Sequence, residues 1–189
     1  EFEAVADRVY VAVAEPESVN IGLVVGTTGA LLIDTGSSPE QGQAIRAAAQ
    51  AVAGEVPLTH AVVTHGHFDH VGGLAAFDDL TTLAHRGLDA TVTRSFGLAA
   101  GVDLGDVHAE LIHFGRGHTD HDVTVVLAAR KVVFFGDLLE SAQPPQAGPD
   151  AWPAEWPTTL DGTLGALQKG FVGVPGHGAV MSREDACIQ

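Results

Sequence analysis

The stretch "VVTHGHFDHVGG" places four side chains that can bind a metal ion, His65, His67, Asp69 and His70, within six positions. Folding that packs these four side chains so closely costs free energy unless a function requires them to lie together. On a helix, residues two positions apart face nearly opposite sides, so His65 and His67 could not easily bind one ion. The apolar run before the cluster and the two glycines after it indicate a strand that turns into a helix. The ligands can then point outward around two adjacent ions.

Three later segments carry further potential ligands. His118 lies in "GRGHTD", Asp137 ends "VVFFGD", and His177 lies in "VPGHG". Each follows an apolar run or stands beside glycines, where the backbone can approach a metal centre closely. Strand ends that meet at one edge of a sheet would bring all of these side chains together. Imidazole and carboxylate ligands suit zinc, and also iron or manganese.

The remaining patterns indicate strands broken by helices. The strongest helix signal has Ser38 as N-cap, Pro39 at the first helical position, Gln41 closing a capping box, and Gly54 at the end. Further helices are predicted at 71–77 and 158–170, a loop at 140–157, and a short helix with a loop at 86–105. Strands are predicted at 8–14, 20–25, 30–36, 59–65, 81–85, 107–114, 122–128, 131–136 and 171–176.

This order of elements predicts a mixed α/β fold in which helices cover packed sheets. The length favours one domain spanning residues 1–189. The formal net charge is −15, so the surface should repel nucleic acid and anionic lipid. The apolar runs are too short to cross a bilayer, and the single cysteine, Cys187, cannot form an internal disulfide. We expect a cytoplasmic protein. Because the chain begins at Glu1 without Met, the alternative that a signal peptide was removed stays open.

The order HxHxDH, then GH, GD and PGHG, resembles the metallo-β-lactamase superfamily of metallohydrolases. The likeness runs from Tyr10 to His177 and includes "LIDTG" before the first helix. Five elements in the family's order are a far more specific signal than any one of them. The resemblance implies a four-layer α-β-β-α sandwich with a two-metal site at one edge of the sheets.

The resemblance also assigns roles to single residues. It implies that His65, His67 and His118 hold the first metal and that Asp69, His70 and His177 hold the second, with Asp137 bridging the two. Asp34 of "IDTG" would orient a ligand imidazole from outside the ligand set.

Two ions roughly 3.5–4 Å apart can share a water and lower its pKa toward ~7, which makes hydroxide available at neutral pH. One ion could then polarise a substrate carbonyl. Asp69, beside that water, would also transfer the proton that the tetrahedral intermediate must pass on, which makes it the candidate catalytic residue. We therefore expect a hydrolase with two Zn²⁺ ions, or alternatively Fe or Mn, that acts on a small molecule.

Differences between this sequence and individual branches of the family narrow the range of substrates that we expect. An aspartate at 137 resembles the ester, thioester and lactone hydrolases more than the β-lactamases, several of which have cysteine there. Only 12 residues follow His177, so the helical domain with which glyoxalase II-type enzymes hold glutathione is not expected. Lactonases carry a tyrosine where this chain has Glu140. The nuclease branch needs an inserted domain and a basic track, which this sequence lacks.

Three alternatives stay open. The first is a persulfide dioxygenase-like enzyme with one iron on His65, His118 and Asp137. The second is a β-lactam hydrolase, and the third is a non-catalytic, metal-stabilised binding module. An intact Asp69 argues against the third, because structural zinc sites tend to be closed and four-coordinate.

Candidate substrate contacts lie near the ligand motifs and in the Pro-rich loop. His121 follows His118 by three positions, and Glu140 follows Asp137 by three. Trp152 or Trp156 could offer an apolar wall to a substrate, or both could pack in a small core.

Overall fold

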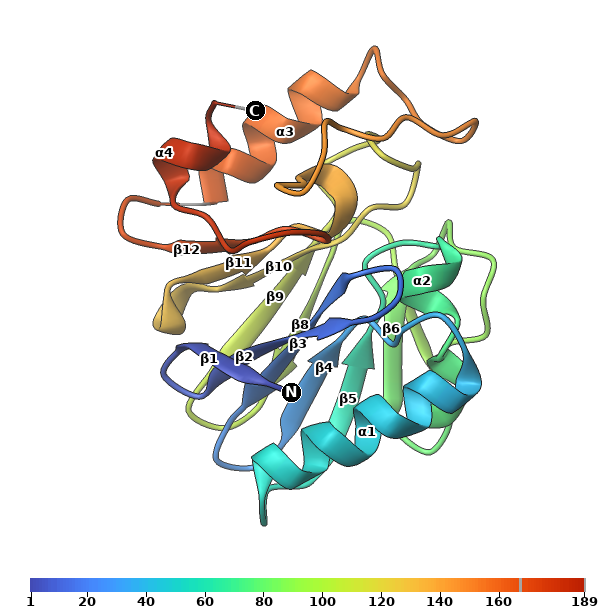
Figure 1. Cartoon of the computed structure of the whole chain (residues 1–189), viewed down its shortest axis with the longest axis vertical. Coiled ribbons are helices and arrows are strands. Elements are labelled where there is room, and N and C mark those ends of the chain that lie inside the picture. The colour runs from blue at the N-terminus through green and yellow to red at the C-terminus, as the bar shows by residue number, and fades with distance from the viewer. Residues whose placement is uncertain (167, 189) are drawn as a thin grey trace.

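The computed structural model describes residues 1–166 and 168–188, whose strands form two sheets (Figure 1). The first sheet follows chain order: β1 (Glu3–Ala6), β2 (Val9–Ala14), β3 (Val19–Val25), β4 (Ala30–Ile33), β5 (Leu58–Val62), β6 (Thr81–His85) and β7 (Arg94–Phe96). The second runs in the order β12 (Val172–Val174), β11 (Val132–Phe134), β10 (Thr124–Leu127), β9 (His108–Ile112) and β8 (Ala99–Asp103). The helices are α1 (Pro39–Ala53), α2 (Phe68–Val71), α3 (Trp156–Ala166), α4 (Arg183–Ala186) and the 3₁₀ turns η1 (Leu74–Phe77), η2 (Ala128–Arg130) and η3 (Gly136–Leu138).

The pairing between neighbouring strands changes once within each sheet from antiparallel to parallel. Strands β1 to β4 are antiparallel neighbours, whereas β4 to β7 pair in parallel. In the second sheet only β11 and β12 are parallel. Parallel strands end at the same edge, so the segments after β4 and β5 emerge together, as do those after β11 and β12.

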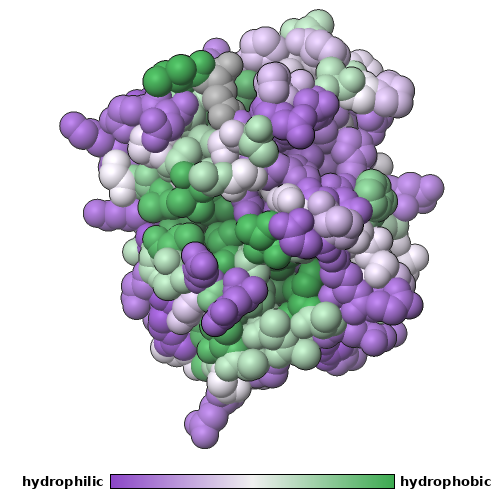
Figure 2. All heavy atoms as spheres, viewed as in Figure 1, coloured by the Kyte–Doolittle hydropathy of each residue, from purple (hydrophilic) through white to green (hydrophobic). Residues whose placement is uncertain are grey.

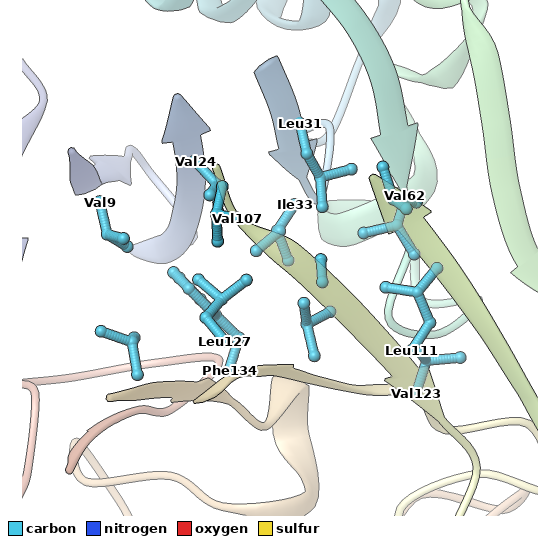
Figure 3. Close-up of a cluster of buried hydrophobic side chains, with 14 of the residues drawn as sticks. Val9, Val24, Leu31, Ile33, Val62, Val107, Leu111, Val123, Leu127 and Phe134 are labelled. Atoms are coloured by element: carbon cyan, nitrogen blue, oxygen red, sulfur yellow. The ribbon is translucent and has the colours of Figure 1, made fainter. Parts of the chain in front are cut away.

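The alternation of side chains along the strands builds two cores on opposite faces of the first sheet. Val24 and Leu31 face the second sheet, whereas their neighbours Leu23 and Leu32 face α1. Figure 3 shows the inter-sheet core, where Leu31 and Val62 approach side chains of the second sheet such as Leu111.

A third core lies between the second sheet and the C-terminal helices. There Val133 and Phe135 pack with Met181, and Leu160 of α3 packs against them. Helix, sheet, sheet and helix are thus stacked in that order. The predicted four-layer α-β-β-α sandwich is confirmed.

Helix α1 begins and ends as predicted, but its capping box is only half formed. The Ser38 hydroxyl accepts from the Gln41 backbone N–H at 3.2 Å. The Gln41 side chain accepts from the backbone N–H of Ser37, one residue before the N-cap. The prediction of a reciprocal box was wrong in this detail, because the long amide reaches past Ser38. Gly54 closes the helix at φ +65°, a conformation that glycine adopts without strain.

Several predicted elements differ from the structure. The stretch 86–105 contains β7 and β8 rather than a short helix, and β1 and α4 were not predicted. The helix predicted at 71–77 is split into α2 and η1, so that Asp69 lies in the first turn of α2. Trp156 begins α3 and does not belong to the preceding loop.

No helix within the described ranges has the length and hydropathy needed to cross a bilayer. Figure 2 shows hydrophobic side chains gathered left of centre, over the edge where β1 and β2 approach β12. Val11, Val13 and Val172 line a groove there.

Candidate metal centre

The candidate ligands follow the ends of strands from both sheets. Strand β5 leads into His65, and α2 carries Asp69 and His70. On the second sheet, Asp137 lies in η3 directly after β11, and His177 follows β12. His118 lies on the connection between β9 and β10. Segments distant in the chain therefore meet at one end of the sandwich.

The first group comprises His65, His67, His118 and Asp137, each offering one ligand atom within 4.8 Å of the others. His67 Nδ1 lies 2.8 Å from His118 Nε2. The Asp137 Oδ2 atom is 3.5 Å from His118 Nε2 and 3.7 Å from His65 Nε2.

The second group comprises Asp69, His70 and His177. Asp69 Oδ2 lies 3.4 Å from His177 Nε2 and 3.7 Å from His70 Nε2. Asp137 also approaches this group, with Oδ1 at 3.2 Å from His70 Nε2 and Oδ2 at 3.5 Å from His177 Nε2. Its carboxylate therefore lies between the two groups, where the resemblance assigns a bridging ligand.

Asp34 fixes two of the imidazoles. His70 Nδ1 donates to Asp34 Oδ2 at 2.8 Å. The Thr64 hydroxyl donates to the same Oδ2 at 2.9 Å, so it can only accept from His65 Nδ1, 3.1 Å away. Both rings are thereby held with Nδ1 protonated and Nε2 directed at the cluster. Asp34 adopts φ +64°, and the backbone N–H of Thr64 donates to its Oδ1 at 2.7 Å, which anchors this unusual conformation.

The other three imidazoles are fixed by acceptors from elsewhere in the chain. His118 Nδ1 donates to the Gln146 carbonyl and His177 Nδ1 to the Glu17 carbonyl, both at 3.1 Å. His67 differs, because its Nε2 donates to Asp150 Oδ2 at 3.0 Å and its Nδ1 faces the cluster.

The inward-facing atoms fit a bound cation. His65 Nε2, His70 Nε2 and Asp137 Oδ1 are buried and make no hydrogen bond within the described ranges. Buried polar atoms are rarely left without a partner. Nitrogen and carboxylate oxygen donors that converge in this way are the ligands of a divalent metal ion.

Burial and charge act on the ligands in opposite directions. Burial lowers the pKa of His65 and of His118, which favours the neutral imidazole that binds metal. Burial also opposes ionisation of Asp137. The positive charge of His70 and a hydrogen bond from His177 outweigh burial and hold the pKa of that carboxyl well below its usual range. The hydrogen bond to Asp137, then that to Asp69, raises the pKa of His177 to about 10.

A close backbone approach at Gly176 completes the site. A Cβ atom at this position would lie 1.8 Å from Asp137 Oδ1. Only glycine lets the strand end after β12 pass this close to the carboxylate.

A cavity of about 780 Å³ opens beside the cluster. Glu140 lines it, as do Asp69 and the ring of Phe68, which is 61% exposed. Phe68 was not singled out in the sequence, and it supplies an aromatic side chain to the lining of this cavity.

The other three predicted substrate contacts are not among the described residues that line this cavity. His121 Nε2 accepts from the backbone N–H of Gly66 at 3.0 Å and so supports the ligand loop. Trp152 packs against the guanidinium of Arg116, 3.8 Å from its ring centroid. Trp156 is buried, donates to the Leu138 carbonyl, and has its ring 5.5 Å from that of His118.

Asp150, Gln146 and Glu17 orient ligand rings yet were not predicted. All three lie in a turn or loop without a spacing signal. Thr64 was also missed, although its position directly before His65 could have marked it.

The metallo-beta-lactamase superfamily model matches residues 14–169, and the chain belongs to this superfamily. The predicted resemblance is thereby confirmed. Metallo-beta-lactamase type 2 from Bacillus sp. (strain 170) is 28% identical over 135 residues, covering 65% of this chain and 52% of that protein. Hydroxyacylglutathione hydrolase from Bradyrhizobium sp. (strain ORS 278) is 29% identical over 135 residues, covering 65% of this chain and 49% of that protein. The chain spans about half the length of these curated relatives.

Among solved structures, a metallo-beta-lactamase from Pontibacter korlensis superposes with a TM-score of 0.85. The alignment covers 99% of this chain and 95% of that one, at 23% sequence identity. This likeness shows the shared fold.

Proposed function

We propose that the protein is a dinuclear metal-dependent hydrolase that binds two Zn²⁺ ions and cleaves a small ester, thioester or lactone. One observation carries the proposal. Five imidazoles each have one nitrogen fixed by an acceptor of the chain and the other directed at a cluster that includes Asp69 and Asp137. Such preorganisation of ligands supports metal binding.

His65, His67, His118 and Asp137 would hold one ion, and Asp69, His70, His177 and Asp137 the other. When bound, two such ions supply Lewis-acid polarisation of a carbonyl and a water that ionises near neutral pH.

The chain's own residues provide proton transfer and shape. Asp69 and Asp137 both line the cavity, and Asp69 is the more exposed of the two, at 13% against 6%. Asp69 is therefore the carboxylate better placed to take a proton from the attacking water and pass it to the leaving group. Phe68 offers an apolar surface to the carbon skeleton of a substrate.

The names of the relatives support hydrolysis of an acyl bond. One is a hydroxyacylglutathione hydrolase, and others are metallo-beta-lactamases. The cavity volume of about 780 Å³ suits a small molecule, and the net charge of −15 disfavours a nucleic-acid substrate.

Elemental mass spectrometry on protein purified without added metal or chelator tests the metal part of the proposal. We expect close to two zinc ions per chain. Close to one iron per chain would contradict this and favour the persulfide dioxygenase chemistry, which oxygen uptake on a persulfide would reveal.

A panel of carboxyl esters, thioesters, lactones and β-lactams tests the reaction. On any substrate that is turned over, Asp69→Asn and His118→Ala should each lower kcat/KM by about 10²-fold or more, as removal of a proton-transfer group or a ligand does. Full activity in both variants, or two bound metals with no hydrolysis of any panel member, would overturn the proposal.

A further inference from the structure

Beyond the ligand groups, the cavity beside the metal centre carries only acidic charged side chains. Apart from the ligand-group residues, the charged side chains that line it are Glu17 and Glu140. The chain has nine lysines and arginines, and none of those in the described ranges lines the cavity. A substrate that presents a carboxylate would meet no counter-charge from these side chains.

Glu140 is the more informative of the two carboxylates. It follows η3, lines the cavity and is only 5% exposed. Its side chain forms no hydrogen bond or ion pair with any residue that the structure describes, and it belongs to neither ligand group. Burial, and then the negative charge of Asp137, raises the pKa of Glu140 to about 7. A buried carboxylate without a partner is unfavourable unless a ligand supplies one.

Glu17 reaches the same cavity from the turn between β2 and β3, which lies near α2 in Figure 1. Its Oε2 atom is buried and has no hydrogen-bond partner in the described part of the chain. Its carbonyl accepts from His177 Nδ1, so the Glu17 backbone is held directly beside the ligand cluster. Two carboxylates from separate elements therefore line the cavity, and no lysine or arginine among the described residues lines it beside them.

We propose that Glu140 and Glu17 bind a positively charged amine of the substrate, so that the enzyme acts on a cationic acyl compound. This rests on the proposed function for the bond that is cleaved. Phe68 and Pro16, which line the same cavity, form apolar surface for the carbon chain between the acyl carbon and the amine. Charge-assisted hydrogen bonds from an ammonium would satisfy both carboxylates.

Three 4-nitrophenyl esters of matched chain length test the charge preference of the zinc-loaded protein: those of 6-aminohexanoate, heptanoate and pimelate. We expect kcat/KM for the aminohexanoate ester to exceed that for the heptanoate ester by about tenfold or more, the size of one charged hydrogen bond. The pimelate monoester should be the poorest substrate. Equal rates, or a preference for pimelate, would overturn the inference.

Variants assign the preference to the two carboxylates. Glu140→Gln and Glu17→Gln should each lower the aminohexanoate-to-heptanoate ratio of kcat/KM by about tenfold. A ratio cancels any general effect of a substitution on the metal centre. Glu55→Gln is the matched control, because Glu55 is exposed and precedes β5, at the opposite end of that strand from His65. An unchanged ratio in both test variants, or loss of bound zinc in Glu140→Gln, would overturn the assignment.

Binding distinguishes failure of this inference from failure of the proposed function. Calorimetry with 6-aminohexanamide and heptanamide needs no turnover of an ester. Tighter binding of the ammonium compound, weakened by Glu140→Gln, would uphold the inference even if no ester were cleaved. Equal binding of the two amides would reject it whatever the activity.

Discussion

Asp150 accepts a hydrogen bond from His67 Nε2 at 3.0 Å, although 83 positions separate the two residues. His67 is the imidazole that faces the cluster with Nδ1, so its tautomer depends on this contact. We predict that Asp150→Ala lowers the affinity for the metal ion at the first group by about 10–100-fold, as loss of a ligand's supporting carboxylate does. Competition with a chromophoric chelator measures the affinity. Asp161→Ala removes an exposed aspartate of α3 and should leave affinity unchanged; equal affinities in the two variants would contradict the role of Asp150.

Gly176 and Gly165 give a contrasting pair of substitutions. In Gly176→Ala the new Cβ would meet Asp137 Oδ1 at 1.8 Å, so the carboxylate must move and metal binding should be lost. In Gly165→Ala nothing lies within 4 Å of the new Cβ, and alanine in a helix should add about 0.5–1 kcal/mol to the free energy of unfolding. Metal content and urea denaturation measure the two effects. A Gly176→Ala protein that retains two metals would refute the close approach.

Asp122 should make stability depend on pH. Burial raises the pKa of Asp122 to about 7, against hydrogen bonds from Thr119 that lower it. The folded chain then binds more protons than the unfolded chain between about pH 4 and 7. The contribution of Asp122 to the free energy of unfolding is therefore fully present below this window and falls as pH rises through it.

Asp122→Asn removes that titration. Urea denaturation of chelator-treated protein at several pH values from 4.5 to 8 should give a difference between wild type and variant that declines with rising pH and levels off above about 7. Parallel curves across this range would show that Asp122 has an ordinary pKa in the folded state.

The inter-sheet core should dominate stability. Leu111 has no exposed surface and packs between the sheets (Figure 3), whereas Leu98 is 73% exposed. We expect Leu111→Ala to lower the free energy of unfolding by about 2–5 kcal/mol and Leu98→Ala by under about 0.5 kcal/mol. Chemical denaturation measures both. Similar values would contradict the packing of Leu111.

Local sequence signals predicted the elements that local chemistry determines. Ser38, Pro39 and Gly54 mark α1 because capping is a property of a few neighbouring residues. The apolar strands were found because both faces of β3 and β4 are buried, which leaves continuous apolar runs. Strands β7 and β8 were missed because their exposed residues and glycines show no alternation.

The ligand cluster was predictable because its motifs are short and ordered along the chain. The residues that orient it were less so. Asp34 came from the family resemblance, whereas Asp150 and Glu17 act through contacts that only the tertiary fold creates. The Gln41 side chain likewise could not be placed, since the choice between Ser37 and Ser38 depends on the exact path of the turn.

The ligand groups draw on both sheets, and more than half of the chain lies between His65 and His177. A cation bound there would tie distant stretches of backbone together in the way a disulfide does, closing a long loop of the unfolded chain. With Cys187 as its single cysteine, this chain cannot form an internal disulfide of its own. The complete ligand groups form only when the two sheets have packed together. Metal binding at the complete site would therefore be a late folding step that stabilises the formed sandwich, not the step that nucleates folding.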